Sequence, residues 1–507
     1  MQNVVRSPRA RRMLGIGVVV LALAVPTACG GSQVDPKVAA AANAAANGAA
    51  ANGNSVTGSN GNTGTDPGTT GTDPGTTGTD PGTTGTDPGT TGTDPGTTGT
   101  TGNTGGTKTG STGNTGGTKT GNSAPPAVAA GSCTGFKNGP GMTDKVIKIG
   151  NSSDVSGPVP GLFAAAQQAT KAYVNYFNST SSICGRKLEL STFDSRTDAG
   201  ADQTSYTKLC ESTFAAVGSM SAFDSGGAAT AQRCGLPDMR TAVVTAARNG
   251  CNTCFGAQPT GPYEFSNAVP DFIVKNYKAA SQKSAFLYLN AGAAAENGKA
   301  QQKVEEKRGM KFVYSSGIDV AATSYAPYVQ QMKSKGVKFV QFIGAYQQSV
   351  RLAQAMRAGN FNPTVRLFDP SVYDQNFLKT GGSAVEGALM FINFTPLEES
   401  QPELNRYKQY LQQVAPGAQP TFFGEFAWSA AKLFVEKAIA LGGKLTRASL
   451  VSSFRSVHAW TGGGMHGPMD VGGKHSPSCV RFLQVKNNKF VPIGGTAYVC
   501  HGSSVGR

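Results

Sequence analysis

From residue 143 onward, the chain alternates between two patterns of apolar and polar positions. Short runs of β-branched and aromatic residues are typical of strands, and longer stretches with apolar residues at every third or fourth position are typical of helices. The predicted strands form two series, 146–149, 187–193, 214–217 and 241–245, then 285–289, 312–315, 339–343, 366–368 and 388–394. The predicted helices are 164–177, 203–212, 303–308, 325–335, 350–357 and 423–441.

Two consecutive series of alternating strands and helices predict an α/β fold with two parallel sheets, each covered by helices on both faces. The patterned region of about 375 residues is too long for a single layer of this kind. A hairpin over 479–485 and 489–492, around Asn487 and Asn488, follows the last predicted helix. We therefore expect two lobes, each a doubly wound parallel sheet.

Residues 29–132 lack this pattern. A unit TDPGTTG begins at residue 65 and repeats every seven residues. The repeat aligns five aspartates, Asp66, Asp73, Asp80, Asp87 and Asp94. Because the unit has no apolar position, it can neither form a coiled-coil seam nor bury enough area to offset chain entropy. We expect a disordered tether with a root-mean-square span of about 50–60 Å. Calcium binding is less favoured, since the aspartate spacing differs from that of known calcium repeats.

The segment before this tether predicts export. Four arginines within the first twelve residues precede an apolar run over 14–25. This is typical of a secretory signal, and the run is shorter than the ~20 residues of a membrane span. The segment VPTACGG at 25–31 resembles a bacterial lipobox, which implies a lipoprotein signal peptide over 1–28 and a lipid on Cys29 that anchors the protein to the outer face of the cell membrane. The alternative is a plain secretory signal with an incidental cysteine.

Charge excludes one class of partner. The net charge is +15, and residues 133–507 contain 38 basic against 24 acidic side chains. Such an excess can favour acidic partners. The lysines, however, are spread along predicted helices as expected for solvated faces, at Lys275, Lys278, Lys299, Lys303, Lys333 and Lys335. We find no nucleic-acid motif and expect no nucleic-acid binding.

Eight cysteines follow Cys29, all at or after position 133, and an even set in an exported chain indicates disulfides. Eight cysteines allow 105 connectivities. The pairs we expect are Cys133–Cys184, Cys210–Cys234, Cys251–Cys254 and Cys479–Cys500. The CxxC spacing of Cys251 and Cys254 also occurs in redox and zinc sites, but no convincing helix follows to lower a thiol pKa. A structural disulfide is our preferred interpretation.

The histidines give little support for an enzyme. They are His458, His466, His475 and His501, and none lies in an HExxH or nucleophile-elbow motif. His466 lies in a Gly-rich turn, where we expect exposure to solvent. We expect no catalytic residue, no metal site and no cofactor.

Several short segments follow one another in a recognisable order. They are DVSGP at 154–158, GRKLEL at 185–190, FDS at 193–195, AVGS at 216–219, KGV at 335–337, GAY at 344–346, VEGA at 385–388 and GMHGPMDVGG at 464–473. Their order resembles that of the Leu/Ile/Val-binding protein family, the type 1 periplasmic solute-binding proteins of ABC importers. The resemblance implies a type 1 periplasmic-binding fold with three crossovers, near 259–262, 393–396 and 442–444. Lobe 1 would then comprise 133–260 and 395–443, and lobe 2 would comprise 261–394 and 444–507.

The resemblance also implies a ligand cleft between the lobes, at the carboxyl ends of the strands, where doubly wound sheets bind ligands. The implied contacts are Ser156, Met220, Ser221, Ala222, Ala246 and Ala247 from lobe 1, and Asn290, Tyr346 and Asp369 from lobe 2. Ser221 would hold a ligand carboxylate, and Asp369 would pair with an ammonium group. Asp369 with Pro370 also fits an ordinary turn after a strand.

These features predict a monomeric solute-binding receptor that works with the permease and ATPase of an ABC importer. Its ligand would be a small polar molecule such as an amino acid or an amide. The alternative is a tethered sensor that uses the same cleft to signal to a partner receptor. An adhesive protein would need no small-molecule pocket.

Overall fold

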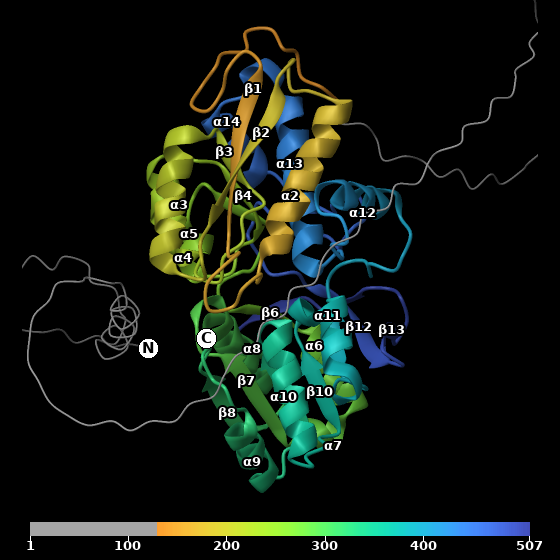
Figure 1. The fold of residues 1–507 in the computed structure, drawn as a ribbon. Helices are drawn as coiled ribbons and strands as arrows, with labels where there is room; N and C mark the ends of the chain where they lie inside the picture. The colour runs from red at the N-terminus through yellow and green to blue at the C-terminus, as the bar shows by residue number, and fades with distance from the viewer. Residues whose placement is uncertain (1–128, 507) are drawn as a thin grey trace, which may run out of the picture. The chain divides into compact units, whose positions relative to one another are not determined.

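The structure, a computed structural model, describes residues 129–506. The predictions for the signal peptide, for Cys29 and for the repeat tether up to residue 128 lie outside the described residues. Within them, the chain forms two lobes, each built on its own parallel or mostly parallel sheet, as the alternating pattern predicts (Figure 1).

The first lobe contains a parallel sheet of five strands in the order β2-β1-β3-β4-β5. The strands are β1 (Val146–Ser153), β2 (Lys187–Asp194), β3 (Ala215–Val217), β4 (Asp238–Ala242) and β5 (Cys254–Gln258). One face is covered by α2 (Ala164–Thr180), α12 (Pro402–Val414) and α13 (Phe422–Leu441). The other face is covered by α3 (Ala199–Ser212), α4 (Ser225–Arg233) and α5 (Ala246–Gly250). Helix α13 is buried on almost every side, which explains its high apolar content.

The second lobe contains a mixed sheet in the order β13-β12-β11-β10-β9-β7-β8. Its parallel strands are β7 (Ser284–Leu289), β8 (Phe312–Ile318), β9 (Phe339–Ile343), β10 (Val365–Phe368) and β11 (Leu389–Ile392), and its antiparallel strands are β12 (Cys479–Lys486), β13 (Lys489–Ile493) and β14 (Val499–Cys500). The hairpin turn predicted at Asn487 and Asn488 is confirmed, since both residues adopt the positive φ, 51° and 58°, that a two-residue turn requires.

Helices cover both faces of the second sheet as well. They are α6 (Ala268–Asn276), α7 (Lys278–Ser281) and α8 (Gly292–Lys307) on one side, and α9 (Ala326–Ser334), α10 (Tyr346–Ala358) and α11 (Gln375–Gly381) on the other, with short 3₁₀ turns η1 (Pro370–Val372) and η2 (Gly382–Ala384). A small antiparallel pair, β6 (Glu264–Ser266) with β15 (Ser503–Val505), completes the lobe.

Strand β4 lies three residues before its predicted position of 241–245. The pattern is misleading because Asp238 and Arg240 are charged yet fully buried on this strand. Asp238 pairs with Arg240 at 3.6 Å, and Arg248 forms ion pairs of 2.9 Å with both Asp238 and Asp202. Thr245 instead caps α5, since its hydroxyl accepts the main-chain N–H of Arg248 at 3.3 Å.

Three segments connect the lobes and lie side by side. The N–H of Gly261, in the first, donates to the hydroxyl of Ser476, in the third, at 2.9 Å. Phe394, in the second, pairs with His466, in the third. The third crossover is misplaced in the prediction at 442–444, because those residues form the 3₁₀ turn η3 (Gly442–Lys444) between α13 and α14 (Arg447–Arg455), and α14 packs on α13 in the first lobe. The chain passes to the second lobe only after α14.

The four disulfides in the structure are the pairs expected from the sequence, namely Cys133–Cys184, Cys210–Cys234, Cys251–Cys254 and Cys479–Cys500. The last joins β12 to β14, whose residues Cys479 and Cys500 are register partners. Cys251 follows α5 and Cys254 begins β5, so this disulfide closes a turn between two regular elements.

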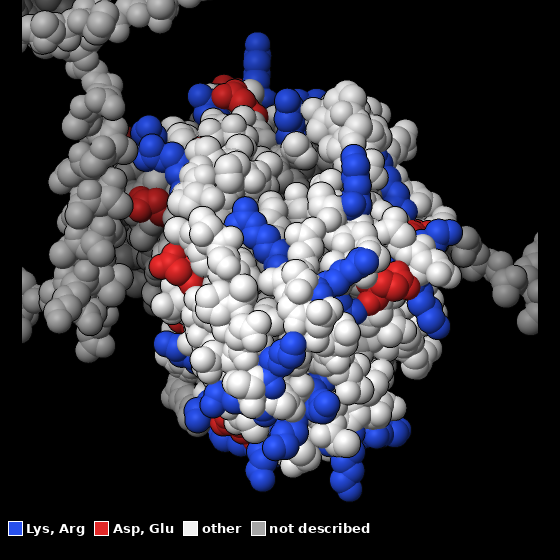
Figure 2. All heavy atoms as spheres, turned by 60° about the horizontal axis from the view of Figure 1, so that its bottom comes forward, with Lys and Arg blue, Asp and Glu red and all other residues white. Residues whose placement is uncertain are grey.

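Lysines gather at the amino ends of the strands of the second sheet. Lys283, Lys311 and Lys338 each stand immediately before one of the neighbouring strands β7, β8 and β9, and all three are exposed. Main-chain hydrogen bonds from Ser284 to Lys311 and from Lys338 to Lys283 hold them in one row. Figure 2, in which the bottom of Figure 1 comes forward, shows more basic than acidic side chains on this side. The lysines predicted to be solvated are indeed exposed.

Candidate ligand-binding site

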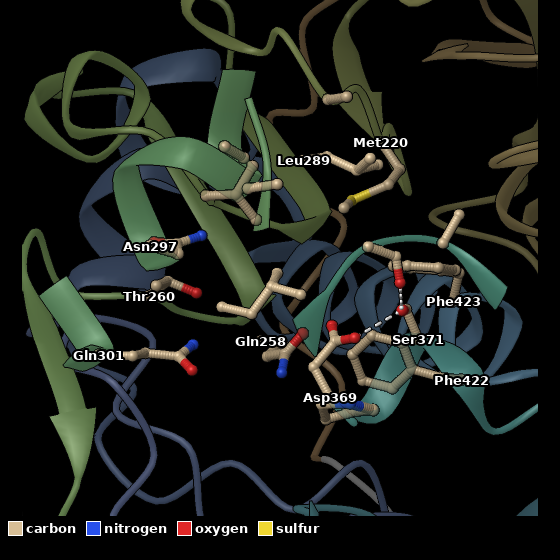
Figure 3. A pocket seen from close by; sticks show the side chains of 18 of the residues that line it. Met220, Gln258, Thr260, Leu289, Asn297, Gln301, Asp369, Ser371, Phe422 and Phe423 are labelled. Atoms are coloured by element: carbon tan, nitrogen blue, oxygen red, sulfur yellow. Dashed lines mark hydrogen bonds between the residues drawn. The ribbon is translucent and has the colours of Figure 1, made fainter. Parts of the chain in front are cut away.

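A cavity of about 240 Å³ lies between the lobes, at the carboxyl ends of the strands of both sheets. The first lobe contributes the loops after β1, β3 and β5 and the start of α13, and the second contributes the loops after β7, β9, β10 and β11 and the first turns of α8. Doubly wound sheets place their loops at this edge because every parallel strand ends there. The predicted cleft is therefore present as a cavity between the lobes (Figure 3).

The wall of the cavity is mostly apolar. Six of its residues are phenylalanines, Phe163, Phe223, Phe265, Phe391, Phe422 and Phe423. Met220 and Leu289 lie near one another on one side of the cavity, and Phe422 and Phe423 lie on another (Figure 3). The rings of Phe163 and Phe423 pack edge to face, with centroids 4.6 Å apart. Such a wall favours burial of an apolar ligand surface.

Among the described residues, Asp369 is one of the two carboxylates, with Glu264, that line the cavity. It follows β10, and its Oδ1 lies 2.8 Å from the hydroxyl of Ser371, which also lies 2.8 Å from the carbonyl oxygen of Gly344. Burial raises the pKa of Asp369 to about 7, against the lowering effect of hydrogen bonds from Ser371 and Gly344. Figure 3 shows the carboxyl group pointing toward the middle of the cavity. Asp369 therefore keeps its proton to a higher pH than an exposed aspartate does.

Apart from the carboxylate of Glu264, the remaining polar side chains are uncharged amides and hydroxyls. Gln258 ends β5, and Asn393 follows β11. Thr260, Asn297 and Gln301 line the opposite side from Ser371 (Figure 3). The wall thus offers a set of hydrogen-bonding groups without a basic side chain among the described residues.

In the first lobe, Asp154 accepts hydrogen bonds from donors beside the cavity. Its carboxylate is fully buried and accepts the hydroxyl of Ser195 at 2.5 Å and the main-chain N–H of Thr197 at 2.9 Å. Its second oxygen accepts the N–H of Ala222 at 2.8 Å. The N–H of Phe223 is likewise taken by the hydroxyl of Ser221, at 3.2 Å.

Two hydrogen bonds join the lobes at the edge of the cavity. The N–H of Ala293, in the first turn of α8, donates to the carbonyl of Ala222 at 3.0 Å. The N–H of Ala246 donates to the carboxylate of Glu296 at 3.0 Å. At Gly292, with φ 47°, a Cβ atom would lie 2.2 Å from the carbonyl oxygen of Ala222, so the close approach requires glycine. The lobes are therefore in contact, in a closed arrangement.

Of the predicted contact residues, the structure brings Met220, Ala222 and Asp369 together on the cavity wall. Tyr346 lines a small adjoining pocket with Leu162 and Phe422. The other predicted residues, Ser156, Ser221, Ala246, Ala247 and Asn290, are not among the residues that line the cavity.

Local interactions explain these other positions. The hydroxyl of Ser156 donates to Asp194. The hydroxyl of Ser221 faces the N–H of Phe223. Arg248 does not reach the cavity, because its guanidinium is buried between Asp202 and Asp238.

Several lining residues escape prediction. Gln258 lies on β5, which the pattern does not reveal, and Phe422 and Phe423 begin a helix that looks like ordinary core. Gln301 and Asn297 lie on the solvated-looking side of α8. The two adjacent phenylalanines directly after Thr421, the N-cap of α13, are the one signal that could have been used, since both cannot face the same core.

His466 is buried, and the predicted exposure is wrong. Its Nε2 lies 2.8 Å from the hydroxyl of Ser429, and its ring stacks on Phe426. The ring nitrogen Nδ1 lies 2.9 Å from the carbonyl of Gly467, and burial lowers the pKa of His466 to about 4. Through Ser429 and Phe426, the neutral imidazole thus holds the third connecting segment against α13.

Residues 129–506 contain neither a group of acidic, histidine and cysteine side chains suited to a metal ion nor a helix long and apolar enough to cross a membrane.

Residues 146–489 match a family model described as a periplasmic binding protein. No curated protein matches the chain. Among solved structures, the fatty acid ABC transporter substrate-binding protein from Thermomonospora curvata is 20% identical, with a TM-score of 0.62, and the match covers 71% of this chain and 94% of that one. A solute-binding protein of an ABC transporter from R. palustris, in complex with 4-hydroxybenzoate, is 18% identical, with a TM-score of 0.58 and coverage of 69% and 96%.

A branched-chain amino acid transporter substrate-binding protein from Streptococcus pneumoniae, in complex with isoleucine, is 15% identical, with a TM-score of 0.57 and coverage of 69% and 99%. At these identities the likeness concerns the fold.

Proposed function

The chain belongs to the periplasmic binding protein family, and from this premise we propose that it is an extracytoplasmic receptor that binds a small molecule between its lobes and delivers it to an ABC importer. The observation that carries the proposal is the cavity at the carboxyl ends of both sheets, which neither lobe could form alone. Its volume of about 240 Å³ suits a small ligand, because pockets for drug-sized ligands span about 300–1,000 Å³.

Ligand binding would favour the closed arrangement. Only this arrangement lets groups from both lobes, such as Met220 and Asp369, contact one molecule at once. A ligand stabilises a conformation by the difference in its affinity for the two states. The interlobe hydrogen bonds of Ala293 and Ala246 form in the same arrangement, so they add to the stability of the liganded form.

We further propose that the mature protein begins at Cys29 and is anchored through lipid on its thiol, with residues up to 132 as a spacer. The lipobox-like segment at 25–31 supports this proposal. Mass spectrometry of the mature amino terminus tests it. A lipid-modified Cys29 is expected, and a free amino terminus at another residue would contradict it.

Calorimetry of the full chain against a library of amino acids, amides, polyamines, carboxylates and alcohols tests the receptor function. Saturable binding with one site per chain is expected. Ala294→Trp, which fills the cavity from α8, should abolish it, and Ala295→Trp, on the same helix but not among the lining residues, should retain it.

Uptake by cells that express these variants separates import from other uses of the cleft. Loss of uptake with Ala294→Trp but not with Ala295→Trp is expected. Binding in vitro with unchanged uptake of the same compound in the Ala294→Trp strain would contradict a role in import and favour a sensor.

A further inference from the structure

We propose that the cavity selects an uncharged, largely apolar molecule whose end group donates a hydrogen bond to Asp369, such as an alcohol or an amide, and that it discriminates against carboxylates, amino acids included. This proposal rests on the receptor function above and names its ligand class.

The apolar wall supports the first part. Phenylalanines from both lobes, together with Met220, Leu289 and Ile343, line the cavity, and most of its surface is apolar. Burial of apolar surface contributes about 25 cal/mol per Å², so a ligand of this size gains most from apolar atoms. A compact zwitterion would leave much of this wall without a partner.

The carboxyl end of the second sheet provides the acceptor. Asp369 follows β10 and Asn393 follows β11, and these strands are parallel neighbours with Phe368 opposite Met390. By this register Asn393 lies two residues beyond the position opposite Asp369, at the same carboxyl edge of the sheet. The hydroxyl of Ser371 lies within 2.8 Å of both Gly344 and Asp369 Oδ1, so one oxygen of Asp369 is already engaged.

The other oxygen of Asp369 can accept a hydrogen bond whether or not the group is protonated. When protonated, Asp369 can donate to Ser371 while Ser371 donates to Gly344. When ionised, Asp369 accepts from both sides. A ligand hydroxyl or amide N–H satisfies this oxygen in either state, and a hydroxyl can also pair with the amide of Asn393.

The groups that could hold a ligand carboxylate are occupied or missing. Asp154 takes the N–H of Ala222, and Ser221 faces the N–H of Phe223. No lysine, arginine or histidine is among the described lining residues, whereas Glu264 and Asp369 both are. A third carboxylate in this wall would be repelled by the charges already there and would be poorly solvated.

One feature of the wall does favour an anion. The first turn of α8, Ala291 to Ala294, lies on the cavity, and helix amino termini attract negative charge. However, the N–H of Ala293 is bonded to the carbonyl of Ala222, and Glu296 places a carboxylate one turn further along the helix. The expected preference is therefore for the neutral end group.

A series of phenylalkyl compounds with four different end groups tests the proposal by calorimetry of the full chain at pH 8. The compounds are 4-phenylbutanol, its methyl ether, 4-phenylbutanoate and phenylalanine. We expect 4-phenylbutanol to bind at least tenfold more tightly than the ether, which has no donor, and at least tenfold more tightly than either carboxylate.

Two variants of Asp369 provide the matched controls. Asp369→Leu keeps a similar volume without an acceptor, so it should bring the alcohol and the ether within threefold of one another. Asp369→Asn keeps an acceptor without a charge, so it should retain the alcohol and improve the affinity for 4-phenylbutanoate.

The outcomes separate the ligand class from the receptor function. If 4-phenylbutanoate or phenylalanine binds as tightly as the alcohol, the ligand class is wrong and the receptor function stands. If the ether matches the alcohol, the hydrogen bond to Asp369 is wrong. If none of the four compounds binds, the ligand class is also wrong, and the library experiment with Ala294→Trp then decides the receptor function independently.

Discussion

The carboxylate of Asp154 lies 2.8 Å from the main-chain nitrogen of Ala222, which donates a hydrogen bond to it. Asp154 also accepts from Ser195 and Thr197, so a fully buried carboxylate is satisfied by three donors without a cation. This relationship ties the loops after β1, β2 and β3 together at the cavity. The hydrogen-bond donors of these loops are therefore satisfied by a carboxylate of the same lobe, that of Asp154.

Asp154→Ala should destabilise the protein by about 3 kcal/mol, because it leaves three donors without a partner in a buried loop. Chemical unfolding of the variant measures this. Asp198→Ala is the control, since Asp198 is exposed and accepts only the N–H of Ala201 as the cap of α3, so its loss should cost only about 1 kcal/mol. Equal losses in the free energy of unfolding for both variants would show that the hydrogen bonds around Asp154 contribute no more than an ordinary helix cap.

Ser221→Ala should change the affinity for 4-phenylbutanol less than twofold, because its hydroxyl faces Phe223 N–H and Ser221 is not among the lining residues. Phe423→Ala removes apolar contact from the cavity and should weaken the same affinity about tenfold, which corresponds to about 1.4 kcal/mol. Calorimetry distinguishes them. A larger effect at Ser221 than at Phe423 would restore the family-based role of the serine.

Asp369 should make the protein less stable as pH rises. Its pKa is raised from 3.8 to about 7 by burial, so between these values the folded state binds a proton that the unfolded state has released. The free energy of unfolding therefore falls as pH rises from about 4 to about 7. Asp369→Asn should remove this dependence.

Denaturant unfolding of both proteins at several pH values tests this expectation. The difference between variant and natural protein should grow in the variant's favour up to about pH 7 and then level off. The difference isolates Asp369, since Asp202, whose pKa burial also raises, to about 6, is present in both proteins. A difference that does not change with pH would contradict the raised pKa.

The disulfides should stabilise unequally. In the chain-entropy model, closing the loop between Cys133 and Cys184 contributes about 4 kcal/mol, and closing the loop between Cys251 and Cys254 about 2 kcal/mol, because the sequence separations are 51 and 3 residues. Paired serine substitutions and unfolding in denaturant measure both losses. The reverse order would show that native packing, rather than loop length, sets the contribution.

Lys283→Gln should stabilise the protein by about 0.5 kcal/mol. Lys283 stands between Lys311 and Lys338 in a row on neighbouring strands, where like charges repel. The gain should shrink in 1 M salt, where charges are screened over about 3 Å. Lys299→Gln, on exposed α8 beside Glu296, is the control and should give no gain. A gain that persists in high salt would point to a cause other than charge.

Much of this fold could be predicted because its strands are apolar and its helices end at recognisable glycines. The two sheets, the hairpin at Asn487 and Asn488 and the order of the family segments all follow from such local patterns. Strand β4 could not be placed in this way, since Asp238 and Arg240 are buried as ions in a network with partners far along the chain. A window of local sequence does not contain those partners.

The candidate site was harder to predict than the fold. The family resemblance implied Asp369, Met220 and Ala222, and each of them follows a strand at the edge of a sheet where the cavity lies. Whether Ser221 reaches the cavity depends on the direction of one side chain, and that direction is decided by the nearby N–H of Phe223. Phe422, Phe423 and Gln258 reach the cavity from elements whose position depends on tertiary packing.

The way in which the chain enters the first lobe has a mechanical consequence. Gly131 donates to Ile439 near the end of α13, Gly443 donates to Ser132, and Cys133 is bonded to Cys184. Phe422, at the other end of α13, lines the cavity, about 26 Å away at 1.5 Å per residue. A pulling force on the preceding chain would act on the disulfide between Cys133 and Cys184, within the first lobe. Tension would therefore not separate the two lobes or release the ligand.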